Sequence, residues 1–350
     1  MTSDRAVSFT QMKDGTKEDY ELLEELEKPY LALTADRILD ELRRQGDATL
    51  EGYRITRLQH GLQSATRAEA DGADLDWEAF PLAEMRKRGY FPDFHGSAQE
   101  LRDYAAEQVS AYIGRVNGGF ALQPALLRSS AHLRTNDKVM DDYALYAWRI
   151  RVLEKAQADP LTAPYQPGTV DQTFMRRLAS LSWSATGPLT AKEYLARHGI
   201  HLVTEPHLPK TYLDGAVCRD ADGNPVIALT LRYDRLDHFW FTLMHELAHV
   251  ARHLDGEPDW FVDDLDAQST EQLEQEADDW AGEALIPSAT WQARRPHDIA
   301  GVEALARELN LAPEIIAGRL RREADDHRRF GKRFRARVRA LFEAQGLFPA

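Results

Sequence analysis

The stretch Phe239-Trp240-Phe241-Thr242-Leu243-Met244-His245-Glu246-Leu247-Ala248-His249-Val250 decides how the second half of this chain is interpreted. Its apolar residues recur at helical spacing, which predicts a buried helix. Residues four apart lie on one face of a helix, about 6 Å apart along its axis, so His245 and His249 can reach one tetrahedral metal ion. Glu246 would then stand beside a water on that ion. Because three ionisable side chains are costly in an apolar helix unless something satisfies them, the stretch predicts a zinc site.

A second block supplies the carboxylate that such a site needs. It runs from Glu274 to Pro287, acidic on one side and apolar on the other. Glu274 and Asp278 share a face, one turn apart, so Glu274 is predicted to bind zinc while Asp278 accepts the outer N–H of a ligating imidazole. Glu276 is the alternative third ligand.

Three further residues are candidates for the edge of the site. His253 lies eight residues beyond His245, about 12 Å along a straight helix, so the two cannot bind the same ion. We expect His253 to support a ligand or to lie at the rim. His207, Tyr212 and His253 are all candidates for a donor that stabilises the oxyanion, and the sequence does not rank them.

The composition limits the class of protein. The 350 residues contain 43 Lys and Arg against 57 Asp and Glu, a net charge of −14, which argues against a surface devoted to nucleic acid. The single cysteine, Cys218, excludes an internal disulfide. No charged-then-apolar leader opens the chain, and its apolar runs are far shorter than the roughly 20 residues that cross a bilayer. We therefore expect a soluble, cytoplasmic protein with no membrane partner.

The periodicity predicts an α+β fold. Helical patterns cover roughly 17–47, 54–70, 98–114 and 120–157, so the first 180 residues are expected to be all-α. From Ile200 the pattern becomes β-rich, with strands at 215–219 and 226–231 around a hairpin-like turn. After Asp237 it is helical to the end. This order predicts a mostly helical N-terminal half followed by a small sheet packed on the active-site helix.

Two charged blocks flank this arrangement. Residues 255–283 hold 12 acidic residues and no Lys or Arg, and residues 319–339 hold 10 Lys and Arg with a net charge of +7. The basic 319–339 segment is able to touch DNA or to cover the acidic block of the same chain. The overall acidity favours pairing within the chain, so direct DNA contact is not the favoured interpretation.

The second half resembles the ImmA/IrrE family of metallo-endopeptidases. The resemblance covers about 183–345 and rests on three stretches: the strand-like 225–233, the Phe-Thr-Leu-Met-His-Glu-Leu-Ala-His block at 241–249, and the block ending in Ala-Leu-Ile-Pro at 284–287. It implies a gluzincin-like domain with zinc held by His245, His249 and Glu274, and Glu246 as the base. Asp278 stands where many relatives have Asn.

The resemblance also implies a substrate class. Known relatives cut a helix-turn-helix repressor in stress-response, mobile-element or toxin–antitoxin-like systems. We therefore expect a partner protein of this class as substrate. We also expect the strand at 225–232 to bind an extended segment of it by backbone pairing. The alternative is a non-proteolytic antitoxin or transcriptional regulator that retains a structural metal site.

The N-terminal part carries two weaker resemblances. Residues 77–155 look like the helical linker region of antitoxin-type relatives, and residues 9–74 resemble inositol-oxygenase-like HD-domain proteins. In the latter family His60 would be the first metal ligand, but no His-Asp pair follows Asp74. We therefore expect a truncated helical module used for protein contacts. The domains are predicted at 1–76, 77–182 and 183–350.

Overall fold

The computed structural model describes Thr16 and residues 76–116, 134–135, 138–254, 267–326 and 328–349. The chain divides into two compact units, Met1–Leu75 and Asp76–Ala350, and the elements below belong to the second. The helices expected at 17–47 and 54–70, and the HD-like module with His60, lie outside the described residues. The three-part domain division stays a prediction.

The order of elements confirms the α+β class. The helices are α4 (Leu82–Lys87), α5 (Ala98–Asp103), α6 (Ala105–Ile113), α8 (Asp142–Ala158), α9 (Gln172–Ser180), the 3-10 helix η3 (Leu181–Trp183), α10 (Gly187–Ala196), α11 (Leu236–Arg252), α12 (Ala267–Leu285), α13 (Ser288–Arg294), α14 (Ile299–Leu309), α15 (Pro313–Glu323) and α16 (Arg339–Glu343). The strands are β1 (Arg134–Thr135), β2 (Lys138–Val139), β3 (His201–Thr204), β4 (Gly215–Arg219) and β5 (Pro225–Leu229). The short pair β1 and β2 interrupts the part expected to be all-α.

The three-stranded sheet has the order β3-β5-β4, with β3 parallel and β4 antiparallel to β5. The β4–β5 hairpin turns at 220–224, as predicted. The expectation that residues 225–232 bind a substrate strand is wrong for β5 itself, because β5 is paired along both edges. Among the described strands of this sheet, β3 and β4 are the outer ones, and each keeps one edge unpaired. Sequence showed that β4 and β5 form a hairpin, but the distant partner β3 decides which of them is central.

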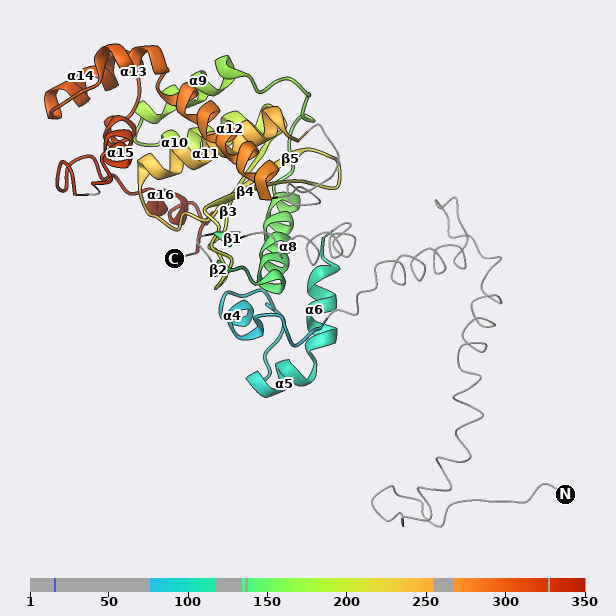
Figure 1. Ribbon diagram of the computed structural model, residues 1–350. Helices are drawn as coiled ribbons and strands as arrows, with labels where there is room; N and C mark the ends of the chain where they lie inside the picture. Colours follow the sequence, from blue (N-terminus) through green and yellow to red (C-terminus); the bar gives the residue numbers. More distant parts are fainter. Residues whose placement is uncertain are drawn as a thin grey trace. The chain divides into compact units, whose positions relative to one another are not determined.

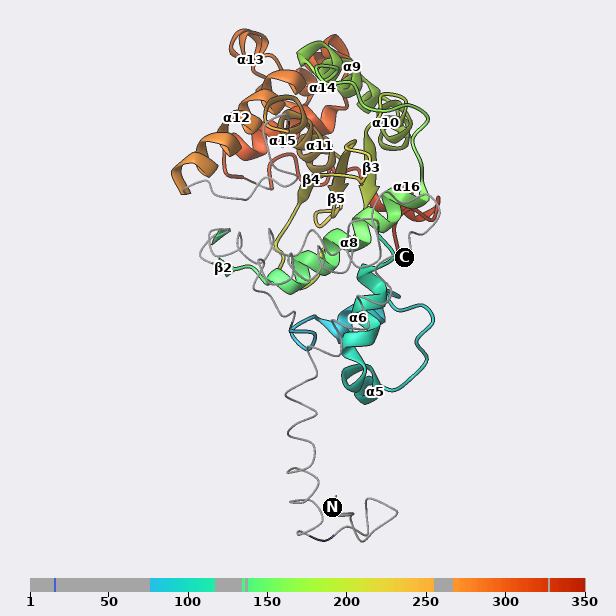
Figure 2. The same ribbon diagram turned by 90° about the vertical axis from the view of Figure 1, so that its right-hand side faces the viewer.

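The sheet lies between α8 and α11 (Figures 1 and 2). Helix α11 buries one apolar stripe in the main core, formed by Phe239, Trp240, Leu243, Met244, Leu247 and Val250. This is the stripe that the periodicity predicted. Helix α12 packs against α11, which places the two blocks singled out in the sequence face to face.

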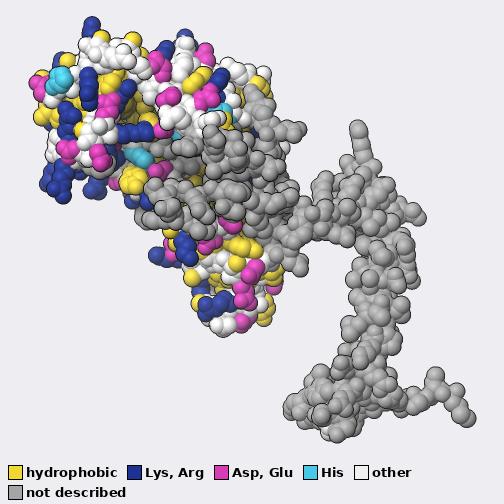
Figure 3. All heavy atoms as spheres, in the orientation of Figure 1, with side chains coloured by type: hydrophobic (Ala, Val, Ile, Leu, Met, Phe, Trp, Pro, Cys, Tyr) yellow, Lys and Arg dark blue, Asp and Glu magenta, His cyan; other side chains and the backbone are white. Residues whose placement is uncertain are grey.

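The basic 319–339 segment is not one helix. Helix α15 ends at Glu323 and α16 begins at Arg339. The buried guanidinium of Arg321 on α15 donates hydrogen bonds to the carbonyls of the residues between the two helices, namely Arg329, Arg333 and Phe334. Figure 3 shows Lys and Arg side chains gathered on the side of the molecule that α15 and the following residues form. One residue of the segment, Arg322, pairs with Asp278 of the acidic block at 255–283.

Candidate metal centre

Helix α11 brings its two histidines together. His245 and His249 project from the same face, and their Nε2 atoms lie 3.0 Å apart. Both rings are largely buried between α11 and α12. The i, i+4 spacing in the sequence therefore places the Nε2 atoms of both rings close to one point, where a single ion could bind them.

Helix α12 adds Glu274 to this pair. Its Oε2 lies 3.1 Å from Nε2 of His245, and its Oε1 lies 3.5 Å from Nε2 of His249. One donor atom from each of the three residues lies within 4.8 Å of the others. Ligand atoms about 2.0–2.2 Å from a tetrahedral zinc ion would be separated by about 3.3–3.6 Å. Two imidazoles and one carboxylate at these distances fit the donor set of a catalytic zinc site.

The outer nitrogen of His245 meets Asp278. Nδ1 of His245 is 3.0 Å from Oδ1 of Asp278, and the other carboxylate oxygen of Asp278 accepts from Nη2 of Arg322 at 2.7 Å. Arg322 lies over the ring of Phe241, 4.7 Å from its centre. Asp278 therefore contacts the outer nitrogen of an imidazole, as expected from the sequence. Its second partner, Arg322, was not suggested by the sequence.

Glu276 and His253 meet each other rather than Glu274. Nε2 of His253 is 3.3 Å from Oε2 of Glu276, and Nδ1 of His253 is 3.0 Å from Nδ1 of His249. His253 therefore lies on the far side of the His249 ring from Nε2. Glu276 also accepts from Arg252 at 2.7 Å. Of the two carboxylates considered as third ligand, the structure brings Glu274 to the imidazoles.

Glu246 lies beside the three converging groups and is only 6% exposed. Burial raises its pKa to about 7, against the lowering effect of His245, and the charges of Glu274 and Asp214 add to the rise. A Cβ atom on Gly215 would collide with the Glu246 carboxylate. Only glycine allows the first residue of β4 to approach so closely, a constraint that the sequence pattern had not revealed.

The electrostatics favour a positive charge at the meeting point. Burial disfavours a charged His245, but hydrogen bonds with Asp278 and Glu274 outweigh it and raise its pKa to about 10. Burial, with the charge of His245, lowers the pKa of His249 to about 4. Burial would raise the pKa of Glu274, yet the two imidazoles hold it below its ordinary value. A divalent cation would satisfy all three ligand atoms at once.

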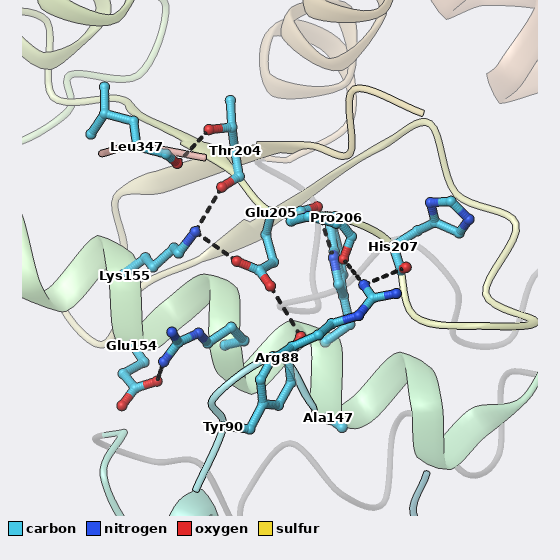
Figure 4. A network of polar contacts seen from close by, with 12 residues as sticks. Arg88, Tyr90, Ala147, Glu154, Lys155, Thr204, Glu205, Pro206, His207 and Leu347 are labelled. Atoms are coloured by element: carbon cyan, nitrogen blue, oxygen red, sulfur yellow. Dashed lines mark hydrogen bonds and ion pairs between the residues drawn. The ribbon is translucent and has the colours of Figure 1, made fainter. Parts of the chain in front are cut away.

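The remaining candidates, His207 and Tyr212, lie on the segment between β3 and β4. Arg88 donates to the carbonyls of Pro206 and His207, at 3.1 and 2.8 Å, and the His207 ring points away from the polar network in Figure 4. Tyr212 has a φ of +53°, and its carbonyl accepts from Arg232. Neither belongs to the group that converges with His245.

Next to Glu246 lies a pair that sequence reasoning missed. Oδ2 of Asp214 is 3.6 Å from Nε2 of His238. Asp214 directly precedes β4, and His238 lies on α11, two turns before His245. Tyr233 packs edge-on against His238 and is half exposed. The i, i+7 relation of His238 and His245 was the available signal, because both lie on one side of the helix.

Comparison with known proteins adds a family to this geometry. Residues 195–321 match Peptidase_M78, the IrrE N-terminal-like domain. The matched part, about a third of the chain, contains α11, α12 and the whole three-stranded sheet. The match supports the expected ImmA/IrrE resemblance and indicates a metallopeptidase-type function, with a protein as substrate.

Searches of curated proteins and of solved structures give no match. The resemblance of residues 9–74 to inositol-oxygenase-like proteins has no support from these comparisons. None of the described helices combines the length and the apolar character that crossing a bilayer requires.

Proposed function

We propose that this chain is a zinc-dependent endopeptidase. The observation that carries the proposal is the convergence of His245, His249 and Glu274 beside the buried carboxylate of Glu246. Two His and one carboxylate are a donor set that catalytic zinc sites use, and a zinc ion held by these three residues would be able to take a water or substrate as a further ligand. His245, His249 and Glu274 would hold the ion.

Zinc bound there would supply Lewis acidity and a water of pKa near 7. Glu246 accepts the proton of the attacking water and returns it to the leaving amine. Its burial favours both steps, since a pKa raised towards neutrality lets one carboxyl accept and donate near pH 7. Asp278 keeps the His245 ring oriented by accepting from Nδ1, and Arg322 holds Asp278.

The free edge of β4 is the place for the scissile segment. An extended peptide paired with β4 would pass the Gly215 backbone, which lies directly against the Glu246 carboxylate. Such pairing requires an extended, flexible stretch in the target. The substrate would therefore be cut in a loop or linker and not within a folded helix.

The finer proposal concerns the target and its setting. By its resemblance to ImmA/IrrE proteins, the enzyme would cut a helix-turn-helix repressor in a cytoplasmic stress-response, mobile-element or toxin–antitoxin-like system. Direct DNA contact through 319–339 is the weaker alternative, because Arg321, Arg322, Arg333 and Arg339 already contact groups of this chain. The M78 match supports a protein substrate of some kind.

The test combines metal analysis with proteolysis. The purified 350-residue protein should contain close to one equivalent of zinc and should cut a helix-turn-helix repressor from its source organism, with fluorescein-labelled casein as a second probe. Glu246→Gln should retain zinc and lose cleavage. The matched control is Asp279→Asn, an exposed carboxylate of α12 that contacts only Gln275 among the described residues.

The outcomes separate the two functions considered. A wild-type protein that binds no zinc after dialysis against the metal contradicts the enzyme proposal. Zinc binding without cleavage of either probe, together with full regulatory activity of Glu246→Gln in cells, would favour the non-proteolytic regulator that uses the metal to hold its fold.

A further inference from the structure

The two imidazoles of the candidate metal centre are supported in different ways. His245 is held directly by a carboxylate, that of Asp278. His249 is held by a second imidazole, that of His253, and the carboxylate of Glu276 lies one step further out. This second series of contacts uses His253, at the C-terminal end of α11, which the sequence analysis expected either to support a ligand or to lie at the rim of the site.

The positions of the protons in the contacts from His249 through His253 to Glu276 follow from the donor atoms. Nε2 of His249 must keep its lone pair to bind a cation, so the proton of a neutral ring is on Nδ1. Only one of two Nδ1 atoms 3.0 Å apart can carry the shared proton, which makes Nδ1 of His253 the acceptor. The proton of His253 is then on Nε2, which faces Glu276 at 3.3 Å. Every link therefore has one donor and one acceptor.

His253 is fixed in this orientation by its surroundings. Its side chain is 5% exposed, and its backbone N–H donates to the carbonyl of His249 at 2.9 Å, at the end of α11. Glu276 in turn is held by Arg252, whose guanidinium lies over Trp280. The contacts run without a gap from the surface arginine to the ring of His249.

We propose that His253, oriented by Glu276, is the positioning residue for His249, and that it fixes both the ring tautomer and the direction of Nε2. This inference rests on the proposed function, because it concerns the metal that the site would hold. It adds a residue that acts on a ligand without touching the ion or the substrate.

An imidazole in this position has a consequence for charge. Asp278 brings a full negative charge next to His245, and its other carboxylate oxygen accepts from Arg322. On the other side, the imidazole of His253 contacts His249, and the carboxylate of Glu276 lies one residue further from a centre that already contains Glu246 and Glu274. Supporting groups of this kind change metal affinity by about 10-fold to 100-fold when removed.

The experiment measures zinc affinity, by competition with a chelating dye, on the full-length protein. His253→Leu should weaken zinc binding by about 10-fold to 100-fold, because Nδ1 of His249 loses the acceptor that His253 provides. His253→Gln, whose side-chain carbonyl can accept that proton, should recover most of the affinity. Glu276→Ala should give an intermediate loss.

A second readout reports the geometry itself. In the Co²⁺-substituted protein the visible absorption bands depend on how the ligands are arranged, so His253→Leu should shift them and His253→Gln should shift them less. Asp279→Ala, which changes the residue next to Asp278 in the sequence but on the exposed side of α12, is the control and should change neither measurement.

The outcomes are distinct from those of the proposed function. Unchanged affinity and unchanged Co²⁺ bands in His253→Leu would overturn this inference and leave the zinc enzyme standing. If His253→Leu does not fold, Glu276→Ala decides in its place, and wild-type affinity in that variant overturns the inference. A wild-type protein with no affinity for zinc overturns the proposed function and this inference together.

Discussion

Two clusters of polar side chains lie on opposite faces of the same sheet, one around the buried Glu205 and one around the partly exposed Glu274, and they differ in how their charges are balanced. Around Glu205, next to α8, the protein supplies its own partners: Nζ of Lys155 lies 2.6 Å from one carboxylate oxygen, and Tyr90 donates to the other at 3.2 Å (Figure 4). Between α11 and α12, Glu274 pairs within the described residues only with His245 and His249.

The difference separates a structural network from a candidate functional site. A buried carboxylate with a cation and a hydroxyl of the protein is satisfied as it stands. A carboxylate whose partners are two imidazoles gains most from a divalent ion that all three groups can bind. The Glu205 cluster should therefore matter to folding under all conditions, and the His245 cluster should matter according to the metal present.

The largest effect is expected from Glu246→Gln. The amide cannot accept a proton from water, so kcat with either protein substrate should fall by about 10²-fold to 10⁴-fold. Zinc content should stay at the wild-type value, because Glu246 is not among the converging ligands. Cleavage assays with parallel metal analysis check both numbers. A loss of zinc with the activity would mean that Glu246 acts as a ligand.

The next effect concerns the other cluster. Glu205→Ala removes the partner of Lys155 and Tyr90, and breaking such a buried pair should lower the free energy of unfolding by about 3 kcal/mol. Urea denaturation measures the change, with the exposed Glu193→Ala as the control. The loss should be the same with and without zinc. A loss that depends on zinc would contradict the separation of the two clusters.

Zinc itself should stabilise the protein by a similar amount. A ligand that binds only the folded state at about 100 times its Kd adds about 2.7 kcal/mol, which raises the melting temperature in a thermal-shift assay. Glu274→Ala should lose most of that gain, whereas Glu276→Gln should keep most of it. Equal gains in all three proteins would mean that zinc binds elsewhere.

The smallest effect is expected from Arg322→Ala. Its pair with Asp278 is short, but the Arg322 side chain is 63% exposed, and such surface pairs contribute about 0–1 kcal/mol. Stability should change by less than about 1 kcal/mol, and zinc affinity only by a few-fold. A loss as large as that of His253→Leu would show that the support of His245 depends on its arginine more than its exposure suggests.

The sequence was most informative where the chemistry depends on residues that are close along one helix. The i, i+4 spacing placed His245 with His249, and the same spacing placed Glu274 with Asp278, because helical geometry alone fixes which side chains share a face. The choice of Glu274 over Glu276 followed from that rule, and the structure brings Glu274 to the imidazoles.

The sequence was least informative where partners are far apart. Tyr90 and Glu205 are separated by 115 residues and Arg322 and Asp278 by 44, and no local pattern connects them. The strand at 225–232 was expected to pair with an extended substrate, and the distant strand β3, which occupies one of its edges, was not foreseen for the same reason. Glu276 was weighed only as a ligand, because its real partners, His253 and Arg252, lie on another helix.

By itself, the amino-acid sequence determined the α+β class, the buried helix with its two imidazoles and the acid beside them, and the carboxylate expected to join them. All of these follow from periodicities of a few residues, which the backbone imposes wherever the segment lies. Only the tertiary structure decided that β4 and not β5 offers a free edge, that Gly215 meets Glu246, and that His253 stands behind His249. Those relations depend on how helices and strands pack, and packing is fixed by shape and burial across the whole core and not by spacing along the chain.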